Sequence, residues 1–455
     1  MTNATAITVT RVAINYENVI RFYNREKELA LLANTWVKSQ KFAQMTFVVG
    51  RRRIGKTTLL TKAYEAGPMV YLFVAKKNEI LLCEEFLEEI SNSLGVEVFG
   101  TMRTFKDVFG FMMELSQTRN FTVIIDEFQE FYNINPSIYS DMQNIWDVKK
   151  NDSKMNLVLC GSVYSMMKRI FENAKEPLFG RATARIYLKA FDISTIKEIF
   201  EDYHPKYSNE NLLAFYMLTG GVAKYVELLA EANAFTLDTI LEEVFSANSL
   251  FLDEGRNVLV DEFGKDYGNY FSILSLIASG KTSRSLMESV LEMQIGGFLD
   301  RLENDFGLIT KVRPVLSKPY GRNVRYMIND QFLNFWFRFI YKYRGAIEMR
   351  NLEYVKKIVK RDYKTYTGLV LERYFVNKIV SEEDLSEIGS YWEKNNQNEI
   401  DIVALNNYQK KAIIIEVKRQ PENIKMNVLR QKATTLVAKL ENYTIEYRGL
   451  SMKDM

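Results

Sequence analysis

A glycine-rich segment near the N-terminus carries the clearest chemical signal in the sequence. Residues 50–57 read G-R-R-R-I-G-K-T and match the phosphate-binding pattern G-x-x-x-x-G-K-[ST] at every fixed position. Gly50 and Gly55 allow backbone N–H groups to turn toward phosphates, and a helix that follows adds the positive end of its dipole. Lys56 can reach the β- and γ-phosphates, and the Thr57 hydroxyl can bind magnesium. We therefore predict that the chain binds ATP together with Mg²⁺.

The predicted nucleotide site comprises the whole loop, the residue after it and one serine farther along the chain. These residues are Gly50, Arg51, Arg52, Arg53, Ile54, Gly55, Lys56, Thr57, Thr58 and Ser162. The three consecutive arginines have a second interpretation as solvated charges, and the sequence leaves this choice open.

An acidic pair at the end of an apolar run provides the second half of the site. Phe121 to Ile125 is continuously apolar and is followed by Asp126 and Glu127, which is typical of a buried strand ending in a Walker B motif. We predict that Asp126 holds magnesium and that Glu127, assisted by Lys56, polarises the attacking water. A solvated acidic turn is the alternative, but the complete phosphate loop upstream favours ATP hydrolysis.

Two weaker candidates belong to the same predicted domain. The apolar run 156–160 is followed by Ser162, which is either a polar sensor of the γ-phosphate or the N-cap of the next helix. Arg181 stands where an arginine finger would lie, with Arg185 as the fallback, and an ordinary surface arginine is the competing interpretation.

A second constellation lies near the C-terminus. Asp401 begins an apolar run, and Glu416 and Lys418 alternate with Val417 in another, so both side chains share one face of a predicted strand. A hairpin would bring Asp401 beside them. Asp401 and Glu416 can bind a divalent metal and Lys418 can orient or deprotonate water at a phosphodiester, with Glu372 completing the ligand set. A surface ion cluster on a hairpin is the alternative.

The elements between these two sites predict a winged helix-turn-helix. Apolar patterns indicate helices at 271–278, 283–291 and 295–302, and then strands at 308–312 and 324–328. The third helix is acidic, which disfavours phosphate contact. The wing is basic, and its charged residues are Lys311, Arg313, Lys318, Arg322 and Arg325. Residues 341–364 combine lysines, arginines and tyrosines, which suits nucleic-acid backbone contact or an ordinary solvated helix face.

Composition limits the chemistry further. The chain has 455 residues, which favours two to four domains, and a formal net charge of +3, which neither requires nor excludes nucleic acid. Its one histidine, His204, is predicted to cap or pack within a loop, so carboxylates, lysine, arginine and magnesium must carry any catalysis. Two cysteines, no signal peptide and no membrane-spanning run indicate a cytoplasmic protein without a membrane partner.

These motifs resemble the archaeal-type ATPases of the STAND branch of AAA+-like proteins. The resemblance rests on Asn24-Arg25-Glu26, the phosphate loop, Asp126-Glu127-Phe128, Cys160-Gly161-Ser162 and Gly180-Arg181. It implies a helical lid whose Gly-Gly-x-Pro-basic-Tyr motif approaches the nucleotide; here the motif is Gly220 to Tyr225, with Ala223 at the proline position. The C-terminal constellation resembles the PD-(D/E)xK nuclease superfamily, which follows a winged helix in that ATPase family.

The resemblance implies an α/β fold class with five segments. They are a P-loop ATPase core with a parallel sheet at 20–191, a helical lid and connector at 192–265, a winged helix at 266–329, a basic helical connector at 330–365 and a restriction-endonuclease-like domain at 366–455.

Two functions follow from this organisation. The first is a slow, nucleotide-dependent ATPase switch coupled to a metal-dependent C-terminal domain that cleaves or binds nucleic acid, DNA rather than RNA. The alternative is a nucleotide-gated scaffold with an inactive nuclease-like domain, which would bind a protein partner or form a homo-oligomer. A transcription regulator is disfavoured by the acidic third helix.

Overall fold

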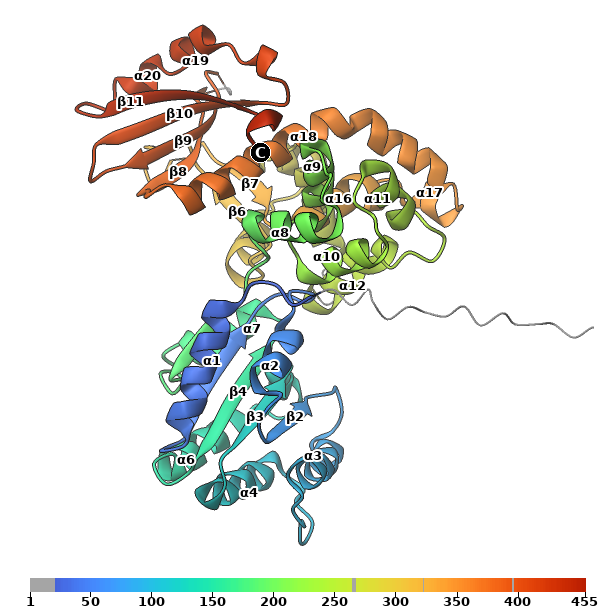
Figure 1. Cartoon of the computed structure of the whole chain (residues 1–455), viewed down its shortest axis with the longest axis vertical. Helices are drawn as coiled ribbons and strands as arrows, with labels where there is room; N and C mark the ends of the chain where they lie inside the picture. Colours follow the sequence, from blue (N-terminus) through green and yellow to red (C-terminus); the bar gives the residue numbers. More distant parts are fainter. Residues whose placement is uncertain (1–20, 264–266, 322, 395–396) are drawn as a thin grey trace, which may run out of the picture.

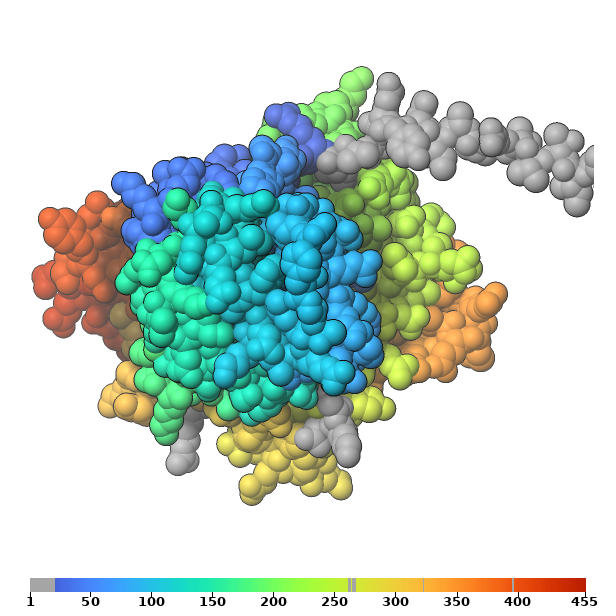
Figure 2. Space-filling model, turned by 90° about the horizontal axis from the view of Figure 1, so that it is seen from below, coloured from blue at the N-terminus to red at the C-terminus, as the bar shows by residue number. Residues whose placement is uncertain are grey.

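The computed structural model describes residues 21–263, 267–321, 323–394 and 397–455. In Figure 1 the core that carries the phosphate loop lies at one end, and the small C-terminal domain and a helical part lie beside each other at the other end. Seen along the long axis in Figure 2, the core stands in front of the helical part, and the C-terminal domain emerges on one side.

The core contains a parallel five-stranded sheet with the order β2-β3-β4-β1-β5. Its strands are β1 (Gln44–Val49), β2 (Met69–Phe73), β3 (Phe121–Asp126), β4 (Met155–Gly161) and β5 (Ala184–Tyr187). β1, β3 and β4 are buried along their whole length, because helices cover both faces of the sheet. The predicted parallel sheet is therefore confirmed, and the runs predicted at 121–125 and 156–160 are strands within one residue at each end; β2 was not predicted.

Helices of the core form two hydrophobic layers, one on each face of the sheet. Val48 packs with Leu32 and Leu59 on one side, whereas Phe47 packs with Met112 on the other. The helices are α1 (Glu26–Ser39), α2 (Lys56–Tyr64), α3 (Glu79–Leu94), α4 (Phe105–Thr118), α5 (Phe131–Ile134), α6 (Ile138–Lys149) and α7 (Tyr164–Glu172), with a short turn, η2 (Phe128–Glu130), after β3.

The lid follows as a cluster of helices on top of the core. They are α8 (Ile193–Tyr203), α9 (Asn209–Thr219), α10 (Ala223–Glu231), α11 (Leu237–Val244) and α12 (Phe251–Phe263). Asp192, Ser208 and Thr236 each cap the helix that follows them through a side-chain oxygen. His204 stacks on Phe235 with a centroid distance of 5.4 Å, so it packs as predicted.

Three helices and a strand pair come next. They are α13 (Tyr267–Ala278), α14 (Arg284–Leu291), α15 (Gly296–Asp300) with its π-helical extension η4 (Arg301–Asp305), and the antiparallel strands β6 (Ile309–Val312) and β7 (Arg325–Ile328). The predicted helices and strands are present at the predicted places. Their assignment as a winged helix-turn-helix stays a prediction, and Arg322 of the predicted wing lies outside the described residues.

The connector and the C-terminal domain share one long helix. After α16 (Gln331–Phe335), the π-helical η5 (Trp336–Tyr341) and α17 (Arg344–Glu348), a 31-residue helix α18 runs from Leu352 to Glu382. The boundary predicted between 365 and 366 falls inside this helix, whose buried residues are spread from Val355 to Ile379. Helical periodicity did not reveal the continuity, because the two halves bury their apolar residues against different partners.

The C-terminal domain is a mixed four-stranded sheet with the order β11-β10-β9-β8. Its strands are β8 (Glu387–Tyr391), β9 (Ile400–Asn406), β10 (Lys411–Lys418) and β11 (Thr444–Ser451); β9 is antiparallel to both neighbours and β11 is parallel to β10. α18 packs against one face through residues such as Leu371. The other face is covered by α19 (Met426–Lys432) and α20 (Thr434–Val437). The remaining short turns are η7 (Pro421–Asn423) and η8 (Met452–Asp454).

Specific polar contacts attach the C-terminal domain to the helical part. Arg419 binds both carboxylate oxygens of Glu210 in the lid at 2.7 Å. Arg325 of β7 pairs with Glu399 at 2.5 Å and lies over the ring of Trp392. The C-terminal domain is therefore held by the lid and by the strand pair together. In the part of the chain that the structure describes, no helix has the length and apolar character needed to span a membrane.

The contact between α12 and η5 provides a test of this packing. A Cβ atom added at Gly255 would lie 2.2 Å from the Trp336 indole, which also donates a hydrogen bond to the Leu252 carbonyl at 2.9 Å. Gly255→Ala should lower the free energy of unfolding by about 1–3 kcal/mol despite the higher helix propensity of alanine. Urea unfolding followed by tryptophan fluorescence measures the change.

Gly368→Ala is the matched control, because Gly368 also lies within a helix and a Cβ there meets nothing within 4 Å. It should be neutral or stabilising by up to about 1 kcal/mol. Equal unfolding midpoints for the two variants would contradict the close packing of Gly255.

Candidate ATP site and C-terminal constellation

The phosphate loop joins β1 to α2 through a tight turn. Gly55 has φ +91° and precedes the first residue of α2, a conformation that glycine adopts without strain. Lys56 is buried, and its ammonium donates to the carbonyl oxygens of Gly50 at 2.7 Å and Arg51 at 3.1 Å. The lysine is thus held inside the loop, where its charge can act on phosphates.

Residues suited to magnesium lie beside the loop. The Thr57 hydroxyl is 3.5 Å from Asp126 Oδ2, which also accepts a hydrogen bond from the Tyr71 hydroxyl. Asp126 Oδ1 accepts from the Glu127 N–H at 2.8 Å and from the Cys160 thiol at 3.0 Å. Burial raises the pKa of the Tyr71 hydroxyl and of the Cys160 thiol, so both remain protonated donors. The Thr57 hydroxyl and the Asp126 carboxylate fit Mg²⁺, because this ion prefers oxygen ligands.

Glu127 is held at the start of the turn after β3. Its backbone has φ +53°, an uncommon conformation for glutamate. Its carboxylate accepts hydrogen bonds from the Ser162 hydroxyl at 2.7 Å and from the Gln129 amide. Because β4 lies between β1 and β3, Ser162 at the end of β4 reaches the predicted catalytic carboxylate. The two hydrogen bonds fix the direction of the Glu127 carboxylate, as a general base requires.

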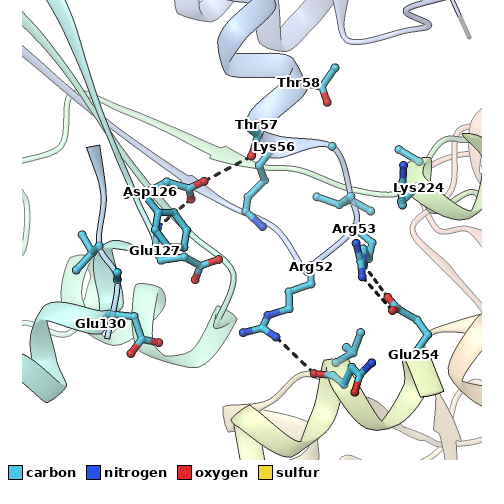
Figure 3. A pocket seen from close by; sticks show the side chains of 18 of the residues that line it. Arg52, Arg53, Lys56, Thr57, Thr58, Asp126, Glu127, Glu130, Lys224 and Glu254 are labelled. Carbon is cyan, nitrogen blue, oxygen red and sulfur yellow. Dashed lines mark hydrogen bonds and ion pairs between the residues drawn. The ribbon is translucent and has the colours of Figure 1, made fainter. Parts of the chain in front are cut away.

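These groups line one cavity of about 740 Å³, a size that suits a nucleotide-sized ligand. Figure 3 shows Lys56, Thr57, Asp126 and Glu127 facing this cavity from the loop and from β3, with the lid helices opposite. The lining residues include Arg52, Arg53, Ile54, Gly55, Lys56, Thr57, Thr58, Asp126, Glu127, Glu130, Lys224, Glu254 and Asn257. The predicted loop and Walker B residues thus meet in one place.

The three loop arginines bind the lid and the segments beyond it. Arg53 pairs with Glu254 of α12 through two contacts of 2.7 and 3.1 Å. Arg52 donates to the Asn257 carbonyl at 3.4 Å, and Figure 3 shows both side chains directed toward α12. Arg51 donates to the Gly307 carbonyl and lies 3.8 Å from Asp330. All three arginines therefore have partners within the chain, and their part in nucleotide binding stays a prediction.

The first turn of α10 lies against the loop. The Lys224 N–H donates to the Arg53 carbonyl at 3.0 Å, and a Cβ at Gly55 would be 3.5 Å from the Cβ of Ala223. The Gly220-Gly221 turn is equally close-packed, since a Cβ at Gly221 would meet the Phe191 carbonyl at 2.2 Å. The lid therefore contacts the loop directly with alanine at position 223.

Arg181 lies elsewhere. It precedes β5, whose amino end is at the sheet edge opposite the phosphate loop, and its guanidinium binds Asp147 of α6 at 2.7 and 3.1 Å. Arg185 lies near Glu172 at 3.7 Å. Neither arginine lines the cavity of its own chain, because a parallel strand carries its first residues to the edge away from the loop. Arg25 also does not line the cavity; it packs on the ring of Phe191 and donates to the Lys189 carbonyl.

The C-terminal constellation assembles on the predicted hairpin. Ile402 pairs with Ile415 across β9 and β10, which places Asp401 beside Glu416. The Lys418 ammonium lies 3.1 Å from Asp401 and 2.9 Å from Glu416. Asp401 also accepts the Val417 N–H at 2.8 Å. Burial raises the pKa of Asp401, whereas the nearby carboxylates hold the pKa of Lys418 above its usual value, so Lys418 is charged here.

Glu372 approaches this group from α18. Burial, followed by the charge of Asp401, raises the pKa of Glu372 to about 8, so it is largely protonated at neutral pH. Among the described residues no three His, Cys, Asp or Glu side chains are grouped as metal ligands. Glu372 does not complete a three-carboxylate set, because its position on a helix outside the hairpin leaves it apart from Asp401 and Glu416.

Most basic residues of the connector are occupied by acids. Lys356 binds Glu242 and Glu353 at 2.5 and 2.8 Å, and Lys360 binds Asp238 at 2.6 Å. Lys356 and Lys360 attach α18 to the lid through these pairs, whereas Arg325 attaches the strand pair to the C-terminal domain. Their ion pairs favour the packing interpretation over an open nucleic-acid surface.

Sequence patterns did not reveal several residues of the two sites. Tyr71, Gln129 and Cys160 bond to the Walker B acids, Glu254 binds the loop, and Lys432 of α19 lies 3.4 Å from Glu416. Apart from Cys160, which begins the Cys160-Gly161-Ser162 run of the family resemblance, none of them belongs to a short motif. The apolar strand ending at Cys160 is the one signal that could have indicated a neighbour of Asp126, because parallel strands end at the same edge.

Comparison with known proteins agrees with the core. Residues 22–229 match a family model described as an ATPase domain predominantly from Archaea. The chain contains an archaeal-type P-loop ATPase domain. Residues 336–430, which include all of α18, match a family of archaeal and bacterial proteins of unknown function.

Individual relatives extend this similarity over most of the chain. The uncharacterized protein MJECL04 of Methanocaldococcus jannaschii is 27% identical over 406 residues, covering 87% of each chain. The Walker-type ATPase PABY2304 of Pyrococcus abyssi superposes with a TM-score of 0.53 at 17% identity, over 70% of this chain and 96% of its own. The ORC2 protein of Aeropyrum pernix has a TM-score of 0.39 at 15% identity, over 75% and 97%. The TM-score of the Pyrococcus abyssi ATPase shows that it and this chain share a fold.

The ATPase domain leads to a direct test. Glu127→Gln should preserve nucleotide binding, because the amide still accepts from Ser162, and should slow ATP hydrolysis by about 10²–10⁴-fold through loss of the base. Lys56→Ala should instead weaken binding. Phosphate release and titration with a fluorescent ATP analogue separate the two effects.

Glu130→Gln serves as the control, because Glu130 lines the same cavity but accepts a hydrogen bond from Asn133. It should hydrolyse ATP within about threefold of the wild type, as expected for a side chain outside the catalytic contacts. Equal rates for Glu127→Gln and Glu130→Gln would contradict the assignment of Glu127.

Proposed function

We propose that this protein is a nucleotide-dependent switch whose ATPase domain controls a metal-dependent site for cleavage of nucleic-acid phosphodiesters, in DNA rather than RNA. The observation that carries the proposal is the convergence of Asp401, Glu416 and Lys418 at one end of a mixed sheet that has helices on both faces. The STAND and PD-(D/E)xK resemblances of the sequence agree with it.

The geometry supports a division of roles in the C-terminal site. Asp401 and Glu416 are the two carboxylates that would hold a divalent metal, which supplies Lewis-acid stabilisation of charge at phosphorus when bound. Lys418 lies between them, so its ammonium can orient a water or balance charge on the phosphodiester. Lys432 reaches Glu416 from α19 and adds a second positive charge for a phosphate.

The switch role is supported by the way the loop is built into its surroundings. Arg51, Arg52 and Arg53 attach the loop to the lid and to the segments around Gly307 and Asp330, so a change in the loop acts on these contacts. The lid in turn binds the C-terminal domain through Glu210 and Arg419. Slow turnover suits a switch, in which the bound nucleotide sets the arrangement of domains.

A nucleotide-gated scaffold is the second candidate. One observation favours it: Glu416 is within 3.4 Å of both Lys418 and Lys432, and Asp401 is bound by Lys418 and a backbone N–H. Carboxylates neutralised in this way can stabilise the domain without any metal. In that case the C-terminal domain binds a protein partner or a second copy of the chain.

A cleavage assay distinguishes the two candidates. Supercoiled plasmid, linear duplex, single-stranded DNA and RNA are incubated with Mg²⁺ or Mn²⁺, with and without ATP. The wild type should cleave DNA in a metal-dependent manner that ATP changes. Glu416→Gln and Lys418→Met should each lose at least about a hundredfold in cleavage, because each removes a group at the reacting centre.

Glu422→Gln is the control for these variants, since Glu422 is exposed on the turn that follows β10. It should cleave as the wild type does. If no substrate is cut under any condition while ATP is bound and hydrolysed, the scaffold function replaces the nuclease.

A further inference from the structure

The loop residue Arg51 is bound on two sides. Its backbone carbonyl accepts the Lys56 ammonium at 3.1 Å, and its guanidinium donates to the Gly307 carbonyl and lies 3.8 Å from the Asp330 carboxylate. Phosphates in the loop compete with the Arg51 carbonyl for the Lys56 ammonium, so nucleotide binding can shift the backbone that carries the Arg51 side chain. Arg51 thereby joins the position of the catalytic lysine to the first residues of α16.

The turn that begins α16 is a meeting point of three elements. Asp330 caps the helix by accepting the Leu333 N–H at 2.9 Å. Gln331 is buried against the lid, where a Cβ at Gly220 would be 2.9 Å from its own Cβ. The Gln331 side-chain oxygen accepts from Arg373 of α18 at 2.9 Å, whereas its buried Nε2 makes no hydrogen bond within the described residues.

On α18, Arg373 and Glu372 are neighbours with different surroundings. Arg373 is partly buried, and the charges of Asp330 and Glu372 act on it. The Asp330 carboxylate therefore acts on two arginines, Arg51 of the loop at 3.8 Å and Arg373 of α18. Beside Glu372, Leu371 packs α18 against the C-terminal sheet.

We propose that Asp330 and Gln331 transmit nucleotide binding from Arg51 to Arg373 and Glu372, and so regulate the C-terminal site around Asp401. The effect of this relay on the C-terminal site rests on the proposed function. The relay itself is an exchange of ion-pair and hydrogen-bond partners. When phosphate draws Lys56 from the Arg51 carbonyl, the loop shifts and the Arg51 side chain leaves Asp330. The charge of Asp330 then acts on Arg373 alone, which loosens the Gln331–Arg373 bond and shifts α18. Figure 1 shows the core and the C-terminal sheet at opposite ends, so α18 is the element suited to carry the signal.

Asp330→Asn is the sharpest test. Asparagine caps a helix about as well as aspartate, so the fold is retained while the charge between the two arginines is lost. Hydrogen exchange of the backbone amides in residues 366–382 is measured by mass spectrometry with and without the ATP analogue AMP-PNP and Mg²⁺. In the wild type the analogue should change the exchange rates by about 5–150-fold, the range of typical allosteric coupling.

In Asp330→Asn this change should fall below about twofold, with analogue affinity within about threefold of the wild type. Glu254→Gln is the matched control, because it breaks the neighbouring Arg53 ion pair and leaves Asp330 intact; it should retain the exchange response of α18. The double variant Arg51→Gln with Asp330→Asn should show the same small analogue-induced change in the exchange of residues 366–382 as Asp330→Asn alone.

The outcomes separate the relay from the proposed function. An unchanged response in Asp330→Asn, or no response of residues 366–382 in wild-type protein saturated with the analogue, overturns the relay. A wild-type response that Asp330→Asn abolishes supports the relay even if no nucleic acid is cleaved, a result that would count against the nuclease alone.

Discussion

A loop that presents its backbone N–H groups to phosphates leaves its side chains available for other contacts. In this protein three consecutive arginines of the loop each contact the lid or the segments beyond it. Arg53 binds α12, Arg52 binds the backbone of the same helix, and Arg51 binds the segments at Gly307 and Asp330. The nucleotide site and the attachment of the core to the rest of the chain are therefore parts of a single loop, and movement of one affects the other.

The C-terminal site depends on the pairing register of β9 and β10. Pairing of Ile402 with Ile415 places Asp401 beside Glu416, and the two-residue period of β10 brings Lys418 to the same face. A shift of one residue would move both β10 side chains to the face covered by α18. The buried apolar residues of β9 and β10 prevent such a shift, because they pack on α18 and on α19 at alternate positions.

Where the sequence-based expectations differ from the structure, the cause is contact between distant segments. Arg181 has the spacing of an arginine finger, but its parallel strand begins at the edge opposite the loop, where Asp147 binds it. Glu372 belongs to a helix that serves both the connector and the C-terminal sheet, so it approaches Asp401 without joining a metal ligand set. The basic connector is likewise paired with acids of the lid that no local pattern indicates.

The sequence by itself determined the phosphate loop, the Walker B acids, the parallel core strands, and the Asp401, Glu416 and Lys418 hairpin. Each of these rests on local spacing, since a glycine turn, an apolar run or a strand alternation involves residues close together in the chain. Tertiary structure alone decided the partners of the loop arginines, the hydrogen bond of Glu127 with Ser162, the length of α18 and the position of Lys432. These features depend on side chains that meet across tens to hundreds of residues, where burial and charge pairing, rather than local pattern, select the contact.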